Sequence, residues 1–190
     1  MFKFFLYPFS TLYGLIVSIR NFLYDYKVFK SNEFEIPVIS IGNITVGGTG
    51  KTPHTEYLVE LLRKQFKVTT ISRGYKRRTK GYHEVAVNST ANEVGDEPLQ
   101  IKSKFDDVQV VVDEKRVHAI KKIQLQETDN LPDVILLDDA FQHRSVTPGI
   151  NILLIDFNRP IDKDRLLPVG RLRESKWQMR RANVIIYTKC

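Results

Sequence analysis

Short apolar runs without alternating polar residues recur along most of the chain. They are rich in Val, Ile and Leu and cover residues 36–42, 67–72, 108–112, 134–137, 150–155 and 184–187. A run without alternation predicts a strand that is covered on both faces, as strands of parallel sheets are. We therefore expect six strands of a mostly parallel sheet.

Segments with apolar residues at helical spacing separate several of these runs. The clearest are residues 52–65, 97–104 and 114–126. Strands that alternate with helices in this way predict a doubly wound α/β fold. The chain has 190 residues, which is enough for one domain of this kind with its own core.

The first 26 residues have a different pattern. Residues 4–19 carry no charge and are rich in Phe, Leu, Tyr and Ile. This stretch is shorter than the roughly 20 residues of a spanning helix, and no small-residue cleavage site precedes Arg20. It predicts an amphipathic helix lying in one membrane leaflet, or alternatively a helix packed on the core. We expect a membrane-associating segment, residues 1–30, and a nucleotide-binding domain, residues 31–190.

Charge and cysteine content narrow the classes of partner. The net charge of +7 favours anionic partners, such as nucleic acid, acidic lipid or phosphorylated metabolites. The chain has no known nucleic-acid module and no interleaving of aromatic and basic residues, so we do not expect a nucleic-acid partner. Cys190 is the single cysteine, which excludes an intrachain disulfide and a cysteine-based zinc site.

A glycine-rich turn follows the first predicted strand. Residues 45–52 fit the Walker A pattern G-x-x-x-x-G-K-[ST], except that Thr45 stands where glycine is usual. An ordinary turn is the alternative, but a buried strand before the turn and a helix after it favour phosphate binding. We expect Lys51 to reach the β- and γ-phosphates of ATP and Thr52 to bind Mg²⁺. The predicted nucleotide-binding residues are Thr45, Val46, Gly47, Gly48, Thr49, Gly50, Lys51 and Thr52.

An acidic pair follows the apolar run 134–137. Asp138 and Asp139 are typical of a Walker B strand end, and adjacent carboxylates repel each other unless a cation lies nearby. We therefore predict a Mg²⁺ site made by Thr52, Asp138 and Asp139. A solvated acidic turn is the alternative, and Asp156, at the end of residues 150–155, is a weaker candidate.

A further carboxylate and several basic residues are also candidates. Asp96 and Glu97 open a predicted helix, where Asp96 suits an N-cap or, alternatively, a base that accepts a proton from an acceptor hydroxyl. Arginine binds phosphate oxygens well, although an exposed loop is its ordinary place. The remaining candidates are Arg73, Tyr75, Gln142, His143, Arg144 and Arg171.

These motifs together resemble those of the tetraacyldisaccharide 4′-kinase family. The matching segments are residues 40–52, 72–75, 95–98, 138–144, 168–174 and 188–190. The Asp-Glu-Pro element and the Phe-Gln-His-Arg element are far more specific than the Walker motifs. The family also tolerates a residue other than glycine at the first Walker position, so Thr45 is compatible with it.

The resemblance implies a reaction in which Mg·ATP phosphorylates the 4′-hydroxyl of a tetraacylated glucosamine disaccharide 1-phosphate, forming lipid IVA in lipid A biosynthesis. It implies that Asp96 is the base, with Lys51, Glu97 and His143 in the same site. It also implies a membrane-bound acceptor, at the cytoplasmic face of the inner membrane. The substrate contacts expected from the motifs are Arg73, Tyr75, Gln142, Arg144 and Arg171.

Family members also have a smaller C-terminal lobe, so we expect these residues to be the N-terminal part of a longer protein. Two other functions stay open from the sequence. One is a membrane-associated GTPase or ATPase switch of the signal-recognition or partitioning type, because residues 188–190 match the first three positions of [NT]-K-x-D. The other is a membrane-bound ATP-binding partner without transferase activity.

Overall fold

A seven-stranded sheet forms the centre of the computed structural model, which describes residues 2–190 and their side chains from Phe4 onward. The strand order is β3-β4-β2-β5-β1-β6-β7, and every neighbouring pair is parallel except β3 with β4. The strands are β1 (Val38–Gly42), β2 (Val68–Ser72), β3 (His83–Glu84), β4 (Gln109–Val112), β5 (Val134–Leu137), β6 (Ile150–Asp156) and β7 (Val184–Thr188). The predicted doubly wound, mostly parallel fold is confirmed.

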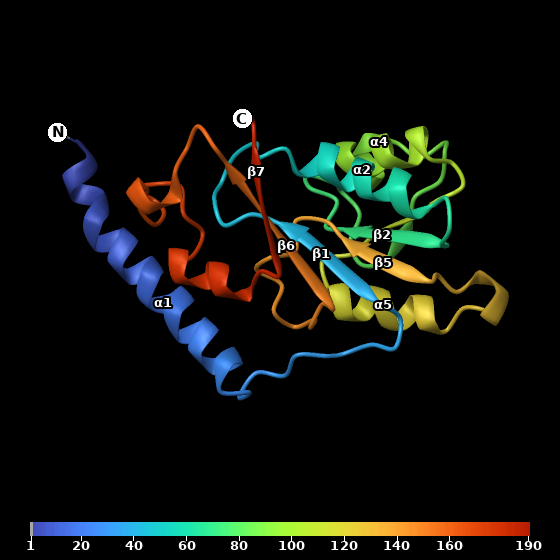
Figure 1. Cartoon of the computed structure of the whole chain (residues 1–190), viewed down its shortest axis with the longest axis horizontal. Helices are drawn as coiled ribbons and strands as arrows, with labels where there is room; N and C mark the ends of the chain where they lie inside the picture. Colours follow the sequence, from blue (N-terminus) through green and yellow to red (C-terminus); the bar gives the residue numbers. More distant parts are fainter. Residues whose placement is uncertain (1) are drawn as a thin grey trace.

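Helices cover both faces of this sheet (Figure 1). The α-helices are α1 (Tyr7–Asp25), α2 (Lys51–Leu62), α3 (Ala91–Val94), α4 (Asp96–Lys104) and α5 (Arg116–Gln124). The 3-10 helices are η1 (Phe2–Leu6), η2 (Thr128–Asn130), η3 (Ile161–Lys163) and η4 (Lys176–Arg181). The two-residue strand β3 and the single turn α3 are additions to the predicted elements, because both are too short to leave a periodic pattern.

Two apolar clusters hold the main helices on the sheet. On one face, Val59 of α2 and Ile101 of α4 pack with Leu136 of β5 and its neighbours. On the other face, Ile120 and Ile123 of α5 pack with buried residues of β2, β4 and β5. Both faces of the central strands are therefore buried, which explains why these strands read as unbroken apolar runs.

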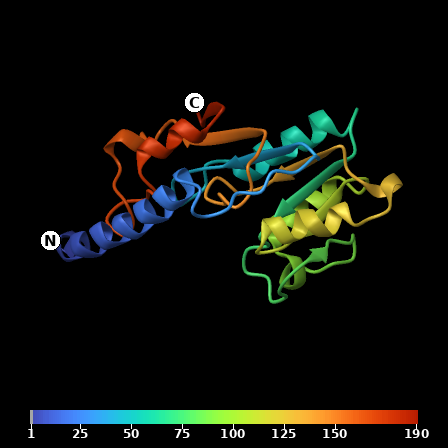
Figure 2. The ribbon, with the colours of Figure 1, turned by 90° about the horizontal axis from the view of Figure 1, so that it is seen from below.

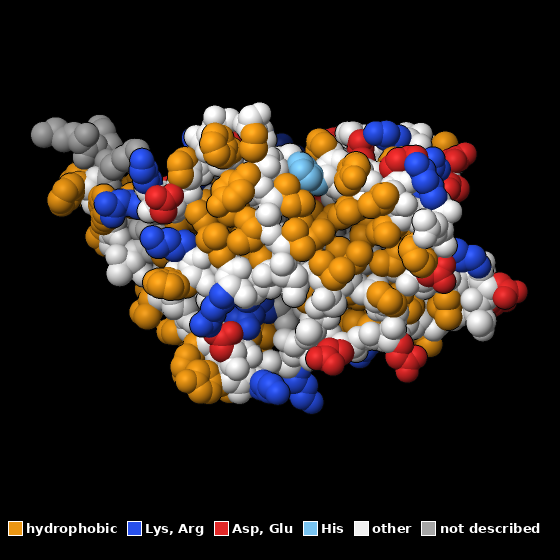
Figure 3. Space-filling model, in the orientation of Figure 1, with side chains coloured by type: hydrophobic (Ala, Val, Ile, Leu, Met, Phe, Trp, Pro, Cys, Tyr) orange, Lys and Arg blue, Asp and Glu red, His pale blue; other side chains and the backbone are white. Residues whose placement is uncertain are grey.

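One face of the molecule is less completely covered toward β7. Apolar side chains gather there between α2 and β7 (Figure 3). They border a groove of about 470 Å³ lined by Ile41, Pro53, His54, Tyr57, Leu58, Ile152 and Ile186.

The N-terminal helix α1 lies beside the last third of the chain and away from the central strands (Figure 2). Its buried residues are small or polar: Ser10, Gly14 and Asn21. Its opposite face is apolar and exposed, and Leu12, for example, keeps 57% of its surface accessible. This is the reverse of an ordinary surface helix, which buries its apolar stripe. Among the described residues, no helix is long and apolar enough to cross a membrane.

Candidate functional site

The glycine-rich loop connects the end of β1 at Gly42 to the start of α2 at Lys51. Gly47 and Gly50 have φ values of +115° and +78°, a region where side chains are disfavoured. Asn43, which is fully buried, donates from Nδ2 to Thr49 Oγ1 at 2.6 Å. The loop is thus held from inside by a side chain that lies directly after β1.

Two further segments hold this loop from outside. The Val46 amide donates to the Arg171 carbonyl, and the Arg173 amide donates to the Ile44 carbonyl, each at 2.8 Å. At the end of β7, the Thr188 hydroxyl donates to the Thr49 carbonyl at 3.1 Å. Hydrogen bonds from other segments therefore hold the shape of the loop backbone, and such preorganisation favours tight phosphate binding.

The acidic pair lies next to this loop because β5 is the direct neighbour of β1, with Ser40 opposite Leu137. Asp138 is buried and accepts a hydrogen bond from Thr55 Oγ1 of α2 at 3.0 Å. Burial, followed by the charge of Glu97, raises the pKa of Asp138 to about 6, although the Thr55 hydroxyl opposes this effect. A cation beside Asp138 would favour its ionised form.

Asp139 is held between two cations. Lys51 Nζ lies 3.7 Å from Asp139 Oδ1, and Arg173 Nη1 lies 3.1 and 3.2 Å from its two carboxylate oxygens. The φ of Asp139 is +47°, in the left-handed region that aspartate tolerates better than most residues. The carboxylate thus lies beside Lys51 of the Walker A motif, so the two predicted motifs meet.

The donor set suits Mg²⁺ that arrives together with a nucleotide. Within residues 2–190, no group of three or more His, Cys, Asp or Glu side chains is arranged to hold a metal ion by itself. Mg²⁺ is commonly bound through one or two carboxylates, several waters and substrate phosphates rather than by a complete protein cage. Asp138, Asp139 and the hydroxyl of Thr52 at the start of α2 provide oxygen donors of this kind.

A cavity of about 540 Å³ opens beside the acidic pair, between α1 and the motif loops. Arg144 is paired with Asp25 of α1 at 2.7 Å, whereas Arg20 and Arg73 form no ion pair with any described residue. The cavity therefore has positive charge available for an anion. Its lining residues are Tyr13, Val17, Arg20, Tyr24, Val46, Arg73, Asp139, Gln142, His143, Arg144, Ser145, Leu167 and Arg173.

Two basic residues lie near the acidic pair, Arg116, which is buried, and His143, which is half-buried. Burial, followed by the charge of Arg116, lowers the pKa of His143 to about 4, so its ring is neutral near pH 7. Burial lowers the pKa of Arg116 to about 10, so that side chain stays charged. Arg116 donates to the carbonyl oxygens of Asp113 and, at 3.2 Å, Asp138. It thereby fixes the backbone at the end of β5.

The predicted base lies at the start of α4. Gly95 is the N-cap of this helix, so the expectation that Asp96 is the cap is wrong, and Asp96 is its first helical residue. The reason is backbone geometry, since Gly95 has a φ of +93° and a ψ of 156°, which essentially only glycine adopts. Asp96 and Glu97 are both exposed, and the charge of Glu97 contributes to the raised pKa of Asp138.

The other predicted substrate residues have different surroundings. Arg73 and Arg144 line the cavity, whereas Tyr75 is 71% exposed and lies outside its lining. Arg171 contributes its carbonyl to the loop, and its side chain is exposed. Gln142 lines the cavity, but its amide also has protein partners, including the Asn43 carbonyl at 2.7 Å. The structure thus groups Arg73, Gln142, His143 and Arg144 and leaves Tyr75 and Arg171 apart.

Several residues of the site were not among the predictions. Arg173 is the arginine that reaches Asp139, although Arg171 is two positions away in the same loop. Thr45 forms an antiparallel bridge with Leu172, which lies between these two arginines, and residues two positions apart in an extended segment point to the same side. The local pattern therefore does not distinguish Arg173 from Arg171. Asn43, Thr55, Arg116 and Glu174 have no local pattern that marks them either.

Known proteins match this chain over almost its whole length. Residues 2–190 match the family model described as Tetraacyldisaccharide-1-P 4'-kinase. A Tetraacyldisaccharide 4'-kinase of Phocaeicola vulgatus is 52% identical over 185 residues, which cover 97% of this chain and 50% of that protein. A Tetraacyldisaccharide 4'-kinase of Bacteroides fragilis strain YCH46 is 54% identical, with 97% and 49% covered. The chain spans about half the length of the curated relatives it matches.

A solved structure is also similar. It is the crystal structure of the "apo" form LpxK from Aquifex aeolicus in complex with ATP, with a TM-score of 0.89 and 40% sequence identity. The similarity covers 100% of this chain and 59% of that one. The fold described above is therefore that of the matching part of this relative.

Proposed function

This chain belongs to the tetraacyldisaccharide 4′-kinase family, and on that premise we propose that it transfers the γ-phosphate of ATP to the 4′-hydroxyl of a tetraacyldisaccharide 1-phosphate, forming lipid IVA. The observation that carries the proposal is the 3.7 Å approach of Lys51 to Asp139, which lines a cavity whose Arg20 and Arg73 form no ion pair with any described residue. The GTPase or ATPase switch is not favoured, because the matching relatives are named as kinases.

The nucleotide half of the proposed reaction uses the loop from Gly47 to Lys51. Its backbone N–H groups and the N-terminus of α2 bind phosphate oxygens, and Lys51 turns from Asp139 toward the transferring phosphate. Thr52, Asp138 and Asp139 hold Mg²⁺, which when bound offsets negative charge on the phosphates. ATP-bound LpxK of Aquifex aeolicus, at 40% identity, supports ATP as the nucleotide.

The acceptor half uses the cavity beside α1. Arg73 forms no ion pair with any described residue, so its guanidinium group is available for the phosphate of the acceptor. Arg20 lines the same cavity, and its Nη2 already donates to Asn21 Oδ1 at 3.3 Å and to the Gln142 carbonyl at 3.4 Å. His143 is neutral near pH 7 and can donate or accept a hydrogen bond there. Asp96, exposed at the start of α4, accepts the proton of the 4′-hydroxyl once the acceptor is in place.

The proposed membrane contact rests on the outer face of α1. We infer that this face lies in the lipid interface, at the cytoplasmic face of the inner membrane, because large apolar side chains cover it while the small and polar side chains are buried. Residues 1–30 then act as the membrane-associating segment. The exposed apolar residues of α1 include Phe9, Leu12, Leu15, Ile16, Ile19 and Phe22.

A matched pair of variants tests the membrane contact. Leu12→Glu in α1 should greatly reduce cosedimentation with vesicles that contain anionic lipid, because it places a charge in the interface. Leu61→Glu in α2 is the control, since Leu61 is 52% exposed and Leu12 is 57% exposed. Equal binding by both variants would contradict a specific role of α1.

Acceptor binding is tested by labelled phosphate transfer at varied lipid concentration. Arg73→Ala should raise KM for the disaccharide 1-phosphate about tenfold with little change in kcat, because about 1.4 kcal/mol of charge-assisted contact is lost in both ground and transition states. Arg78→Ala is the control, since Arg78 is exposed and does not line the cavity. An unchanged KM for Arg73→Ala would remove Arg73 from the acceptor site.

A further inference from the structure

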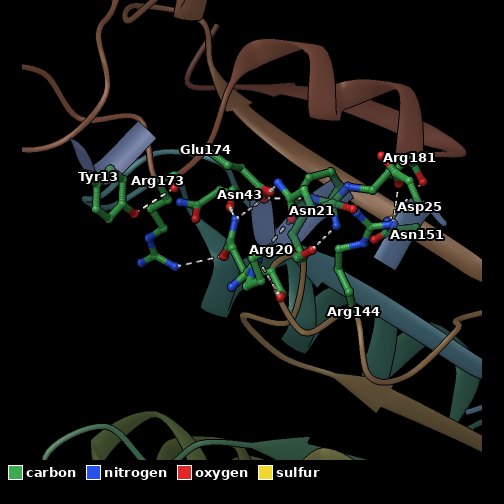
Figure 4. Close-up of polar contacts among 12 residues, drawn as sticks. Tyr13, Arg20, Asn21, Asp25, Asn43, Arg144, Asn151, Arg173, Glu174 and Arg181 are labelled. Carbon is green, nitrogen blue, oxygen red and sulfur yellow. Dashed lines mark hydrogen bonds and ion pairs between the residues drawn. The ribbon is translucent and has the colours of Figure 1, made fainter. Parts of the chain in front are cut away.

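A fully buried carboxylate lies between α1 and the motif loops. Glu174 is 0% exposed, and its Oε1 accepts hydrogen bonds from Arg181 at 2.7 Å and from Gln142 at 2.9 Å. Its Oε2 accepts a hydrogen bond from Nδ2 of Asn21 at 3.1 Å (Figure 4). Burial of a carboxylate is unfavourable unless such partners are present, so each of the three donors matters to the arrangement.

Gln142 connects this carboxylate to both halves of the nucleotide site. Its Nε2 also donates to the Asn43 carbonyl at 2.7 Å, and Asn43 in turn donates to Thr49 in the glycine-rich loop. Its Oε1 accepts from Arg173 at 3.3 Å, and Arg173 holds Asp139. The Gln142 amide therefore contacts both Asn43, which holds the glycine-rich loop, and Arg173, which holds Asp139.

The hydrogen bonds that join Glu174, Gln142, Asn43, Arg173 and Asn21 form one network, and Asn21 is its member from α1. Its side chain is 2% exposed, although the opposite face of the helix is apolar and open. The backbone carbonyl of Asn21 accepts from Arg144 at 2.9 Å, which fixes this turn of the helix against the loop after β5. Another buried polar contact of α1 is different in kind, since Ser10 donates to the Leu166 carbonyl and does not reach Glu174.

We propose that Glu174 is a positioning residue that couples the seating of α1 to the shape of the glycine-rich loop and the place of Asp139. The proposal rests on the proposed nucleotide site. When Asn21 is in place, its amide holds Oε2 of Glu174, and Oε1 stays directed at Gln142. Without that donor the Glu174 carboxylate reorients, and Gln142 moves with it. The contacts of Gln142 with Asn43 and with Arg173 are then weakened. The helix that carries the proposed membrane face thus sets the affinity of the site for Mg·ATP.

The test measures the dissociation constant of Mg·ATP by calorimetry and the free energy of unfolding by urea, for each variant of the full chain. Asn21→Ala and Glu174→Gln should each weaken Mg·ATP binding by about five- to tenfold, as expected for coupling through a packed polar network. Ser10→Ala is the control, because it removes a buried contact of the same helix outside the network. It should leave the dissociation constant unchanged, whatever its effect on stability.

A double variant tests the coupling itself. Asn21→Ala added to Glu174→Gln should weaken binding no further than either substitution alone, because both break one path. The proposal is overturned if the effects of the two substitutions on the dissociation constant of Mg·ATP multiply in the double variant. It is also overturned if Asn21→Ala lowers the free energy of unfolding but leaves that dissociation constant unchanged. If Glu174→Gln does not fold, Asn21→Ala against Ser10→Ala decides alone. Failure of the unaltered chain to bind Mg·ATP would instead contradict the proposed function.

Discussion

Replacing Asp138 with asparagine should make the unliganded chain more stable. Asp138 is buried, and burial raises its pKa from 3.8 to about 6, with a further contribution from Glu97. Each unit of pKa corresponds to about 1.4 kcal/mol, so the ionised Asp138 carboxylate lowers the free energy of unfolding by about 3 kcal/mol at pH 7.5. Asp138→Asn removes this charge and keeps an oxygen that can accept from Thr55.

The sign of the pH dependence follows from the raised pKa. Between about pH 4 and pH 6 the folded chain binds the proton of Asp138 more strongly than the unfolded chain does, so stability falls as pH rises through this window. The advantage of Asp138→Asn should therefore be about 3 kcal/mol at pH 7.5 and roughly half of that at pH 5. The same variant should lose Mg·ATP binding, a cost of function that accompanies the gain in stability.

Urea unfolding at both pH values, with a chelator and without nucleotide, measures these differences. Asp162→Asn in η3 is the control, because Asp162 is exposed and its replacement should change stability by no more than about 0.5 kcal/mol. An Asp138→Asn variant that is less stable than the unaltered chain at pH 7.5 would refute the reasoning. A difference that is the same at both pH values would refute the assigned cause.

Two other predictions concern backbone geometry and titration. Gly95→Ala should lower the free energy of unfolding by about 3 kcal/mol, because alanine is strained at φ +93° and its Cβ would lie 3.1 Å from the Gly74 backbone. Gly81→Ala is strained in the same way at φ +77°, but open space surrounds it, so it should lower the free energy of unfolding by only about 1 kcal/mol. Urea unfolding of both variants checks this, and equal losses would contradict the steric part. The ring of His143 should titrate in a proton NMR experiment with a midpoint near 4, so that stability falls as pH decreases below about 6.5; a midpoint near 6.5 would contradict its burial.

The sequence pattern located the strands closely. Residues 134–137 were expected as a strand and form β5 with the same bounds, because an apolar run followed by two aspartates has no competing helical period. The loop at 45–52 lies between a strand and a helix as expected, and Lys51 meets Asp139. These features are encoded within short windows of the chain.

Features that depend on distant partners left no such pattern. Glu174 belongs to a loop that reads as exposed, yet Asn21 is 153 residues away and Gln142 is 32 residues away in sequence. Asp96 has the residue type of an N-cap, but the conformation of Gly95 moved the cap by one position. Burial of Glu174 and the backbone of Gly95 are properties of the packed fold, and local propensity carries little information about either.

The central claim is phosphate transfer to the lipid, and the direct measurement follows γ-labelled phosphate from Mg·ATP into tetraacyldisaccharide 1-phosphate in detergent micelles. The protein is expressed from its full reading frame, with Lys51→Ala and Asp96→Ala beside it. We predict a lipid with a second phosphate, at the 4′ position, and loss of most of the rate in both variants. Hydrolysis of ATP or GTP without any labelled lipid would contradict the account.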